Sequence, residues 1–99
     1  MAARLLLHEK VLTGHGDLTE TVVWSVPRTT AYSLGVRYRL AFVPGGAGRP
    51  AVLYDNHHPK GPHRHREGRE EPYEYVDIRR LRLDFERDVA RWRETRREL

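Results

Sequence analysis

The sequence predicts an α+β fold, in which an antiparallel meander of four to five strands packs one face against a C-terminal helix. Three observations support this fold class. Over residues 36–43, large apolar residues occupy every second position and arginines lie between the first three of them, as in a half-buried strand. Glycine- and proline-rich turns separate the short apolar segments. An apolar stripe with helical spacing runs through the C-terminal part of the chain. We therefore expect a single domain over residues 1–99, with strands within 4–76 and a helix over 77–98.

The first two strands are predicted over residues 4–12 and 18–26, joined as a hairpin through the glycine-rich turn at residues 14–17. In the second strand, one face carries Leu18, Val22, Trp24 and Val26. Pro27 ends this strand because it has no N–H to donate to a neighbour. The apolar faces predict that the tryptophan and tyrosine side chains belong to the core.

The third strand, over residues 36–43, is the clearest. Its alternation sends one set of side chains to the core and Arg37 and Arg39 to the opposite face, the first set being Val36, Tyr38, Leu40 and Phe42. After a turn at 44–48, residues 51–55 predict a short fourth strand. Residues 56–68 are expected to form a polar loop, and residues 73–76 a short fifth strand.

The helix over residues 77–98 has a polar residue at its start that suits the N-cap position, Asp77. Spacings of three, four and seven residues define its apolar stripe, which consists of Ile78, Leu81, Phe85, Val89, Trp92 and Leu99. Leu83 lies off the stripe, so we expect it to be partly exposed.

Composition excludes several classes of protein. The chain has 99 residues and no cysteine, which excludes disulfide scaffolds, thiolate zinc sites and cysteine nucleophiles. Its apolar runs are too short for a membrane span or a signal-peptide core, so we expect a cytoplasmic protein without a membrane partner. The net charge of +4 fits an anionic partner, but an arginine-preferring genome explains it equally well, since much of the charge can pair along the helix.

The side chains best suited to catalysis or metal binding are concentrated in residues 55–65, which hold four of the six histidines. Asp55, Lys60 and Arg64 are interleaved with them, in a Gly- and Pro-rich segment that follows a strand. Histidine is the side chain whose ordinary pKa lies nearest to neutral pH, so such a cluster suits proton transfer.

Three interpretations of this segment remain open. In the first, two histidines act as general base and general acid on a phosphodiester, with Lys60 and Arg64 holding the phosphate. In the second, His58, His63 and His65 bind a divalent metal such as zinc, with Asp55 as a fourth ligand. In the third, the segment is a solvated polar loop without a chemical role.

Two further pairs of residues allow more than one role. Glu70 and Glu71 could orient a histidine by accepting its ring proton, although solvation is the simpler interpretation. Arg37 and Arg39 could widen a phosphate-binding surface, but the exposed face of a half-covered sheet needs such residues anyway.

At these residues the chain resembles the TumE family of toxins from bacterial type II toxin–antitoxin systems. The resemblance covers about residues 5–89. Its central part is Tyr54-Asp55-Asn56, His58-x-Lys60-Gly61-x-His63-Arg64-His65, Glu71-Pro72-Tyr73 and Tyr75, and it extends upstream to residues 23–27 and 38–42. The chain departs from the family pattern at Pro59, where a glycine is usual, and at Pro62, where an acidic residue is common. Pro59 also removes a backbone N–H that could hold a phosphate.

The resemblance implies a small intracellular toxin encoded beside a helix-turn-helix antitoxin. By analogy with other small toxins, we expect a metal-independent endoribonuclease that binds RNA and needs no cofactor. His58 and His63 would share the acid and base roles, Asp55 would orient one of them, and His65 would assist. Lys60 and Arg64 would bind phosphate, with Arg37 and Arg39 extending that surface. The alternative is a non-catalytic metal-binding or protein-interaction module that uses the same loop, with zinc on His58, His63 and His65. An edge-exposed sheet also allows a homodimer.

Overall fold

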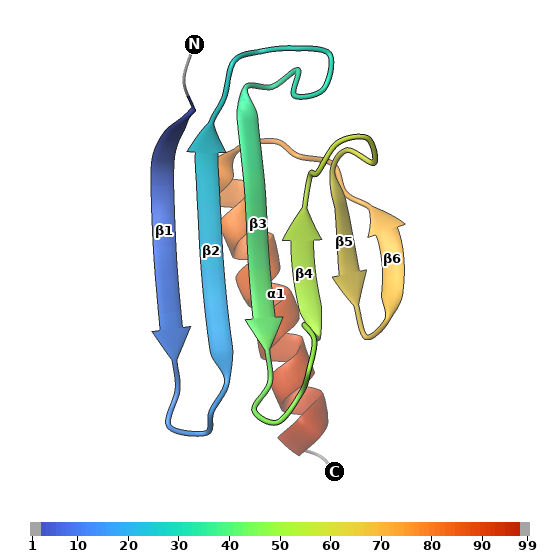
Figure 1. Cartoon of the computed structure of the whole chain (residues 1–99). Coiled ribbons are helices and arrows are strands. Elements are labelled where there is room, and N and C mark those ends of the chain that lie inside the picture. Colours follow the sequence, from blue (N-terminus) through green and yellow to red (C-terminus); the bar gives the residue numbers. More distant parts are fainter. Residues whose placement is uncertain (1–2, 98–99) are drawn as a thin grey trace.

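The computed structural model describes residues 3–97, which form a six-stranded antiparallel sheet with one helix across one face (Figure 1). The strands follow one another in chain order across the sheet, so the predicted α+β meander with a C-terminal helix is confirmed. The elements are β1 (Arg4–Leu12), β2 (Leu18–Ser25), β3 (Val36–Val43), β4 (Val52–Asp55), β5 (His63–Arg66), β6 (Arg69–Pro72) and α1 (Ile78–Arg97).

The core lies between the middle strands and α1. Val23 of β2 pairs with Tyr38 of β3, and Leu40 of β3 pairs with Tyr54 of β4, so these side chains share the face that the helix covers. The fully buried part of this core consists of Tyr54, Phe42, Leu40, Leu81, Val23 and Val52. The predicted alternation of the third strand is therefore confirmed, because Arg37 and Arg39 are exposed on the opposite, open face.

The helix α1 begins and packs as its sequence predicts. The carboxylate of Asp77 accepts a hydrogen bond from the backbone N–H of Arg80 at 2.7 Å, which confirms it as the N-cap. The stripe residues Leu81, Phe85 and Val89 are buried against the sheet, while Leu83 is 50% exposed, as expected. The last predicted stripe residue, Leu99, lies outside the described residues.

The expected loop over residues 56–68 is wrong in its second half. Residues 63–66 form β5, which pairs with β6 through a tight turn at Glu67 and Gly68, both with positive φ (52° and 80°). The hairpin contains no aliphatic residue, so hydrophobic alternation could not predict it. Cross-strand charge pairs such as Arg64 with Glu71 stabilise it instead.

The fifth strand expected over residues 73–76 is also absent from the described structure. This segment runs as irregular chain from β6 to α1. Tyr73 and Tyr75 instead pack on the core from this connection, because their rings find aromatic partners there. The ring of Tyr73 lies 4.9 Å from that of Tyr54, and the ring of Tyr75 stacks 5.5 Å from that of Tyr38.

Trp24 is a third correction, because it does not belong to the core. Thr21 and Val23 take the buried side of β2, and Trp24 points to the open face with 37% of its surface exposed. Both faces of this strand carry apolar residues, so alternation alone did not decide which face the helix covers. Trp92, in contrast, packs its ring 5.3 Å from that of Phe42, in agreement with the predicted stripe.

Over residues 3–97, no helix has both the length and the apolar character that a membrane crossing requires.

Candidate functional site

The strand β5 separates the histidines from the arginines of the predicted segment. Its sequence is His-Arg-His-Arg, and successive side chains of a strand point to opposite faces. His63 and His65 pair with Asp55 and Leu53 of β4 and lie on the open face. Arg64 and Arg66 lie on the face toward α1, where both approach Asp88. The open face therefore receives two imidazoles from a single short strand.

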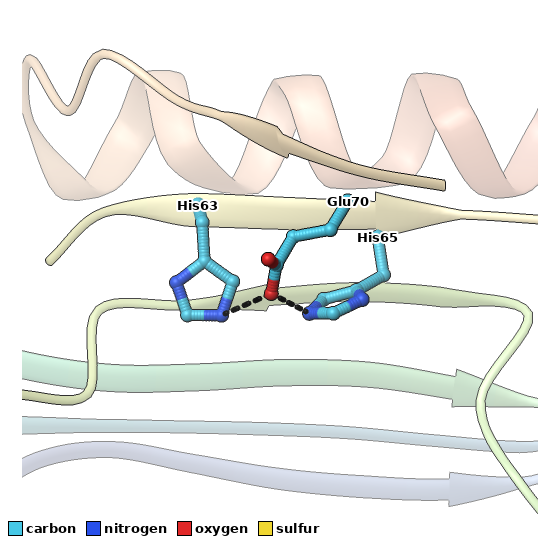
Figure 2. A group of neighbouring side chains, drawn as sticks. All are labelled: His63, His65 and Glu70. Atoms are coloured by element: carbon cyan, nitrogen blue, oxygen red, sulfur yellow. Dashed lines mark ion pairs between the residues drawn. The ribbon is translucent and has the colours of Figure 1, made fainter. Parts of the chain in front are cut away.

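The carboxylate of Glu70 is the centre of this cluster. Glu70 is the direct cross-strand partner of His65. Its Oε1 atom lies 2.6 Å from Lys60 Nζ, 3.1 Å from His65 Nε2 and 3.9 Å from His63 Nε2. Figure 2 shows the carboxylate between the two imidazole rings. The hydrogen bond from Lys60 is the main reason that the pKa of Glu70 lies below its usual value, and the two histidines add to the effect.

His63 is held in one orientation by the backbone. His63 is 8% exposed, and its Nδ1 lies 2.8 Å from the carbonyl oxygen of Gly61. A carbonyl oxygen can only accept, so Nδ1 carries the hydrogen and donates it. In the neutral ring, Nε2 is then the unprotonated nitrogen, and it faces Glu70 from beyond hydrogen-bond distance. The ring is thus prepared to accept a proton or a metal ion at Nε2.

Cations extend the site along the open face. Arg39 of β3 pairs with Asp55 of β4, and Asp55 pairs with His63, so the three residues form one row across the sheet. Arg37 and Arg39 are exposed, and they line a hollow together with Trp24 and Asp55. The structure therefore brings Arg37 and Arg39 onto the same face as the histidine cluster.

Asp55 and His58 lie outside the cluster. The carboxylate of Asp55 accepts the backbone N–H of His57 at 2.5 Å, which is the geometry of an Asx turn at the end of β4. His58 is exposed in the following loop, and its backbone N–H donates to the Tyr32 hydroxyl at 3.3 Å. Within residues 3–97, the group of side chains able to share a metal ion is His63, His65 and Glu70.

Arg64 stabilises the fold and does not face the histidine cluster. Its Nε donates to Glu71 at 2.9 Å, and its Nη1 donates to the hydroxyl of Tyr54 at 3.0 Å and lies 3.4 Å from Asp88. The Tyr54 hydroxyl donates in turn to Asp88, and burial is the main cause that raises the pKa of Tyr54. Arg64 thus connects the β5–β6 hairpin to the core and to α1, on the face opposite His63.

Glu70 belongs to the cluster, although the sequence favours solvation for it. Solvation was the simpler interpretation of Glu70 and Glu71, whereas both carboxylates accept from neighbouring side chains. The sequence signal for this pairing is the Glu67-Gly68 turn, because a hairpin centred on that turn places Glu70 opposite His65.

The arrangement supports two kinds of chemistry. Two imidazoles on either side of an ionised carboxylate, with an ammonium beside it, can hold an anionic substrate and transfer protons. The donor atoms of His63, His65 and Glu70 also lie within 4.8 Å of one another, so they can bind a metal ion after small side-chain movements.

Comparison with known proteins identifies the family. The sequence model of the family described as toxin TumE matches residues 3–93, which includes the whole sheet and most of α1. None of the curated proteins or solved structures that were compared matches the chain. Because the family match covers nearly the full chain, its toxin role applies to this protein, and the chain belongs to the TumE family of toxins.

Proposed function

We propose that this toxin is a metal-independent endoribonuclease whose reaction takes place on the open face of β5 and β6. One observation carries the proposal. His63 Nε2, His65 Nε2 and Lys60 Nζ all lie within 3.9 Å of one carboxylate oxygen of Glu70. Proton-transfer groups and a cation are therefore available in one place, beside the exposed Arg37 and Arg39.

In this proposal His63 is the general base. Its Nε2 takes the proton of a ribose 2′-hydroxyl, and the 2′-oxygen attacks the adjacent phosphorus. His65 is the general acid: in its protonated ring, Nε2–H stays on Glu70 and Nδ1 gives its proton to the 5′-oxygen as the P–O5′ bond breaks. The products are a 2′,3′-cyclic phosphate and a 5′-hydroxyl, and no oxidant or cofactor is needed. The support for this order is that the Nδ1 hydrogen bond to Gly61 leaves His63 Nε2 free to accept.

Glu70 and the cations have supporting roles in this scheme. Glu70 orients His65 by accepting a hydrogen from its Nε2. Lys60, whose side chain is 60% exposed, can turn from Glu70 to the phosphate, and Arg39 supplies further positive charge along the same face. We assign no phosphate role to Arg64, which is engaged with Glu71 and Tyr54, and no proton transfer to Asp55 or His58.

A ribonuclease toxin needs a partner that neutralises it. We propose an antitoxin with a helix-turn-helix domain, encoded beside the toxin, and a cytoplasmic location where both partners meet RNA. The edge strand β1 exposes Leu6 and Leu12, so we propose it as the edge through which two chains form a homodimer.

Expression in bacteria and cleavage by the purified protein test this function together. Expression of the wild-type protein should arrest growth and degrade cellular RNA. The purified protein should cleave RNA in the presence of a chelator and leave cyclic phosphate ends. His63→Ala and His65→Ala should each lower the cleavage rate by about 100-fold or more. His15→Ala is the control, because His15 is exposed in the turn between β1 and β2 and should leave cleavage unchanged.

The proposal fails if folded wild-type protein cuts no RNA, or if His63→Ala and His65→Ala cut as fast as His15→Ala. Thermal unfolding of each variant separates loss of chemistry from loss of fold.

A second candidate function is metal binding by His63, His65 and Glu70. The favouring observation is that His63 donates its Nδ1 hydrogen to a backbone carbonyl, as metal-bound histidines commonly do. Zinc suits this donor set, and Lys60 would have to leave Glu70. Titration calorimetry with zinc chloride should then show one site per chain that Glu70→Ala abolishes. Chelator-resistant cleavage without zinc binding excludes this candidate.

A further inference from the structure

Trp24 and two exposed arginines form a second feature of the open face. Trp24 of β2 pairs with Arg37 of β3, and Val22 pairs with Arg39, so all four side chains share this face. They line one hollow, whose apolar wall includes Val22 and Val26 and whose cations are Arg37 and Arg39. Partly exposed apolar side chains that lie together and are rimmed by charged ones mark interaction sites, and Trp24 with Val22 and Val26 forms such a patch.

The arginines of this hollow differ from those of β5. Arg64 and Arg66 form ion pairs with Glu71, whereas Arg37 and Arg39 form none within residues 3–97. The two acidic residues of the hollow are already engaged, since Glu20 bonds His8 and Asp55 accepts the His57 N–H. Hydrogen-bonding capacity for an anionic group therefore remains on the guanidinium groups.

The hollow adjoins the histidine cluster, because Asp55 lines the hollow and pairs with His63. The row from Val22 through Arg39 and Asp55 ends at His63. Three strand spacings separate β2 from β5, which is about 14 Å across the sheet. A short single strand bound at His63 can reach Trp24 across this distance.

We propose that Trp24 is a stacking platform for an unpaired RNA base, with Arg37 and Arg39 binding the adjoining phosphates. This inference rests on the proposed ribonuclease function and specifies its substrate as single-stranded RNA. An aromatic ring beside cations recognises single strands, because an unpaired base offers a free ring face. A base within a duplex is already stacked on both sides and cannot lie on Trp24.

Binding of a short 2′-O-methyl RNA, which cannot be cleaved through its 2′-oxygen, tests the proposal by fluorescence anisotropy. Trp24→Ala should raise the Kd about tenfold or more, and Trp24→Phe should restore most of the affinity. Arg39→Gln should weaken binding and lower its dependence on salt concentration. Leu83→Ala is the control, since it removes an exposed apolar side chain from α1 and should leave the Kd unchanged.

The proposal is overturned if Trp24→Ala and Leu83→Ala bind equally well, or if a duplex of the same sequence binds as tightly as the single strand. The experiment also separates the two proposals. If RNA binding depends on Trp24 but the protein cuts no RNA, only the proposed ribonuclease function is rejected. If Trp24→Ala changes neither the cleavage rate nor the affinity for RNA, only the proposed stacking role of Trp24 is rejected.

Discussion

The hydroxyl of Tyr54 donates a hydrogen bond to the carboxylate of Asp88, which joins β4 to α1 inside the protein. Asp88 is 3% exposed, and it also lies near the guanidinium groups of Arg64 and Arg66. Helix, sheet and terminal hairpin therefore meet at one buried carboxylate. The β5–β6 hairpin, which has little apolar surface of its own, depends on this contact for its position.

Asp88→Ala should accordingly destabilise the protein. It leaves the Tyr54 hydroxyl without its acceptor and removes one of the two carboxylates that Arg64 and Arg66 contact, so the free energy of unfolding should fall by about 3 kcal/mol. Urea denaturation measures this change. Glu94→Ala, an exposed acidic position on the same helix, should stay within about 0.5 kcal/mol of wild type. Equal stability of the two variants would show that Asp88 does not hold the hairpin.

Asn56 should be a second position of high sensitivity. Its Oδ1 accepts the backbone N–H of Tyr38 at 2.9 Å, and its Nδ2 donates to the carbonyl of Val36 at 2.9 Å. The side chain thus continues the pairing of β3 where β4 has ended. Asn56→Ala leaves buried backbone groups unpaired and should lower the free energy of unfolding by about 2 kcal/mol. A change below 0.5 kcal/mol would mean that water replaces the amide without cost.

Gly45 should not tolerate a side chain. A Cβ atom there would lie 2.5 Å from the backbone carbonyl oxygen of His15, because the turns at the ends of two hairpins touch. Its N–H also donates to Asp17 at 2.8 Å. Gly45→Ala should therefore lower the midpoint of thermal unfolding, at a cost of about 1–3 kcal/mol. Gly48→Ala meets no atom within 4 Å and should unfold close to wild type.

The stability of the β5–β6 hairpin should depend on acid through Glu71. Hydrogen bonds from Arg66 and then Arg64 hold the pKa of Glu71 below its usual value. A lowered pKa means that the folded state binds fewer protons, so this stabilisation is present above the unfolded pKa and is lost as pH falls through the folded pKa. Urea unfolding from neutral to strongly acidic pH should show a shallower decline for Glu71→Gln. An identical pH dependence would contradict this role.

Glu70→Gln should distinguish orientation from metal binding. An amide oxygen can still accept from His65 and Lys60, so cleavage should stay within about tenfold of wild type under the acid–base proposal. If Glu70 is a zinc ligand, the same change should weaken zinc binding by more than tenfold. A loss of cleavage as large as that of His63→Ala would instead make Glu70 a proton-transfer group itself.

Elements with apolar periodicity could be predicted from the sequence. Residues 36–40 alternate between apolar and polar side chains, and the stripe from Ile78 to Trp92 fits a single helix face, so the structure confirms both elements and the faces that they bury. Trp24 shows where this reasoning ends. Val22, Val23 and Trp24 are all apolar, and only the position of α1 decides which of them is covered.

The location of the candidate site could be predicted from the sequence, but the set of residues that form it could not. Histidine density pointed to residues 55–65, and His63, His65 and Lys60 do meet there. Glu70 joins them through strand pairing, which depends on a hairpin stabilised by charge rather than by apolar contacts. Local sequence also could not show that Arg64 points away from its histidine neighbours, since that follows from β5 being a strand.

The alternation of β5 has a practical consequence. Its histidines face the open side and its arginines secure the hairpin, so the two duties fall on different residues of one strand. Replacement of the histidines alone should give a harmless protein that keeps its native shape. Such a toxoid can be produced in quantity without killing its host, and it would serve as bait to isolate the cognate antitoxin.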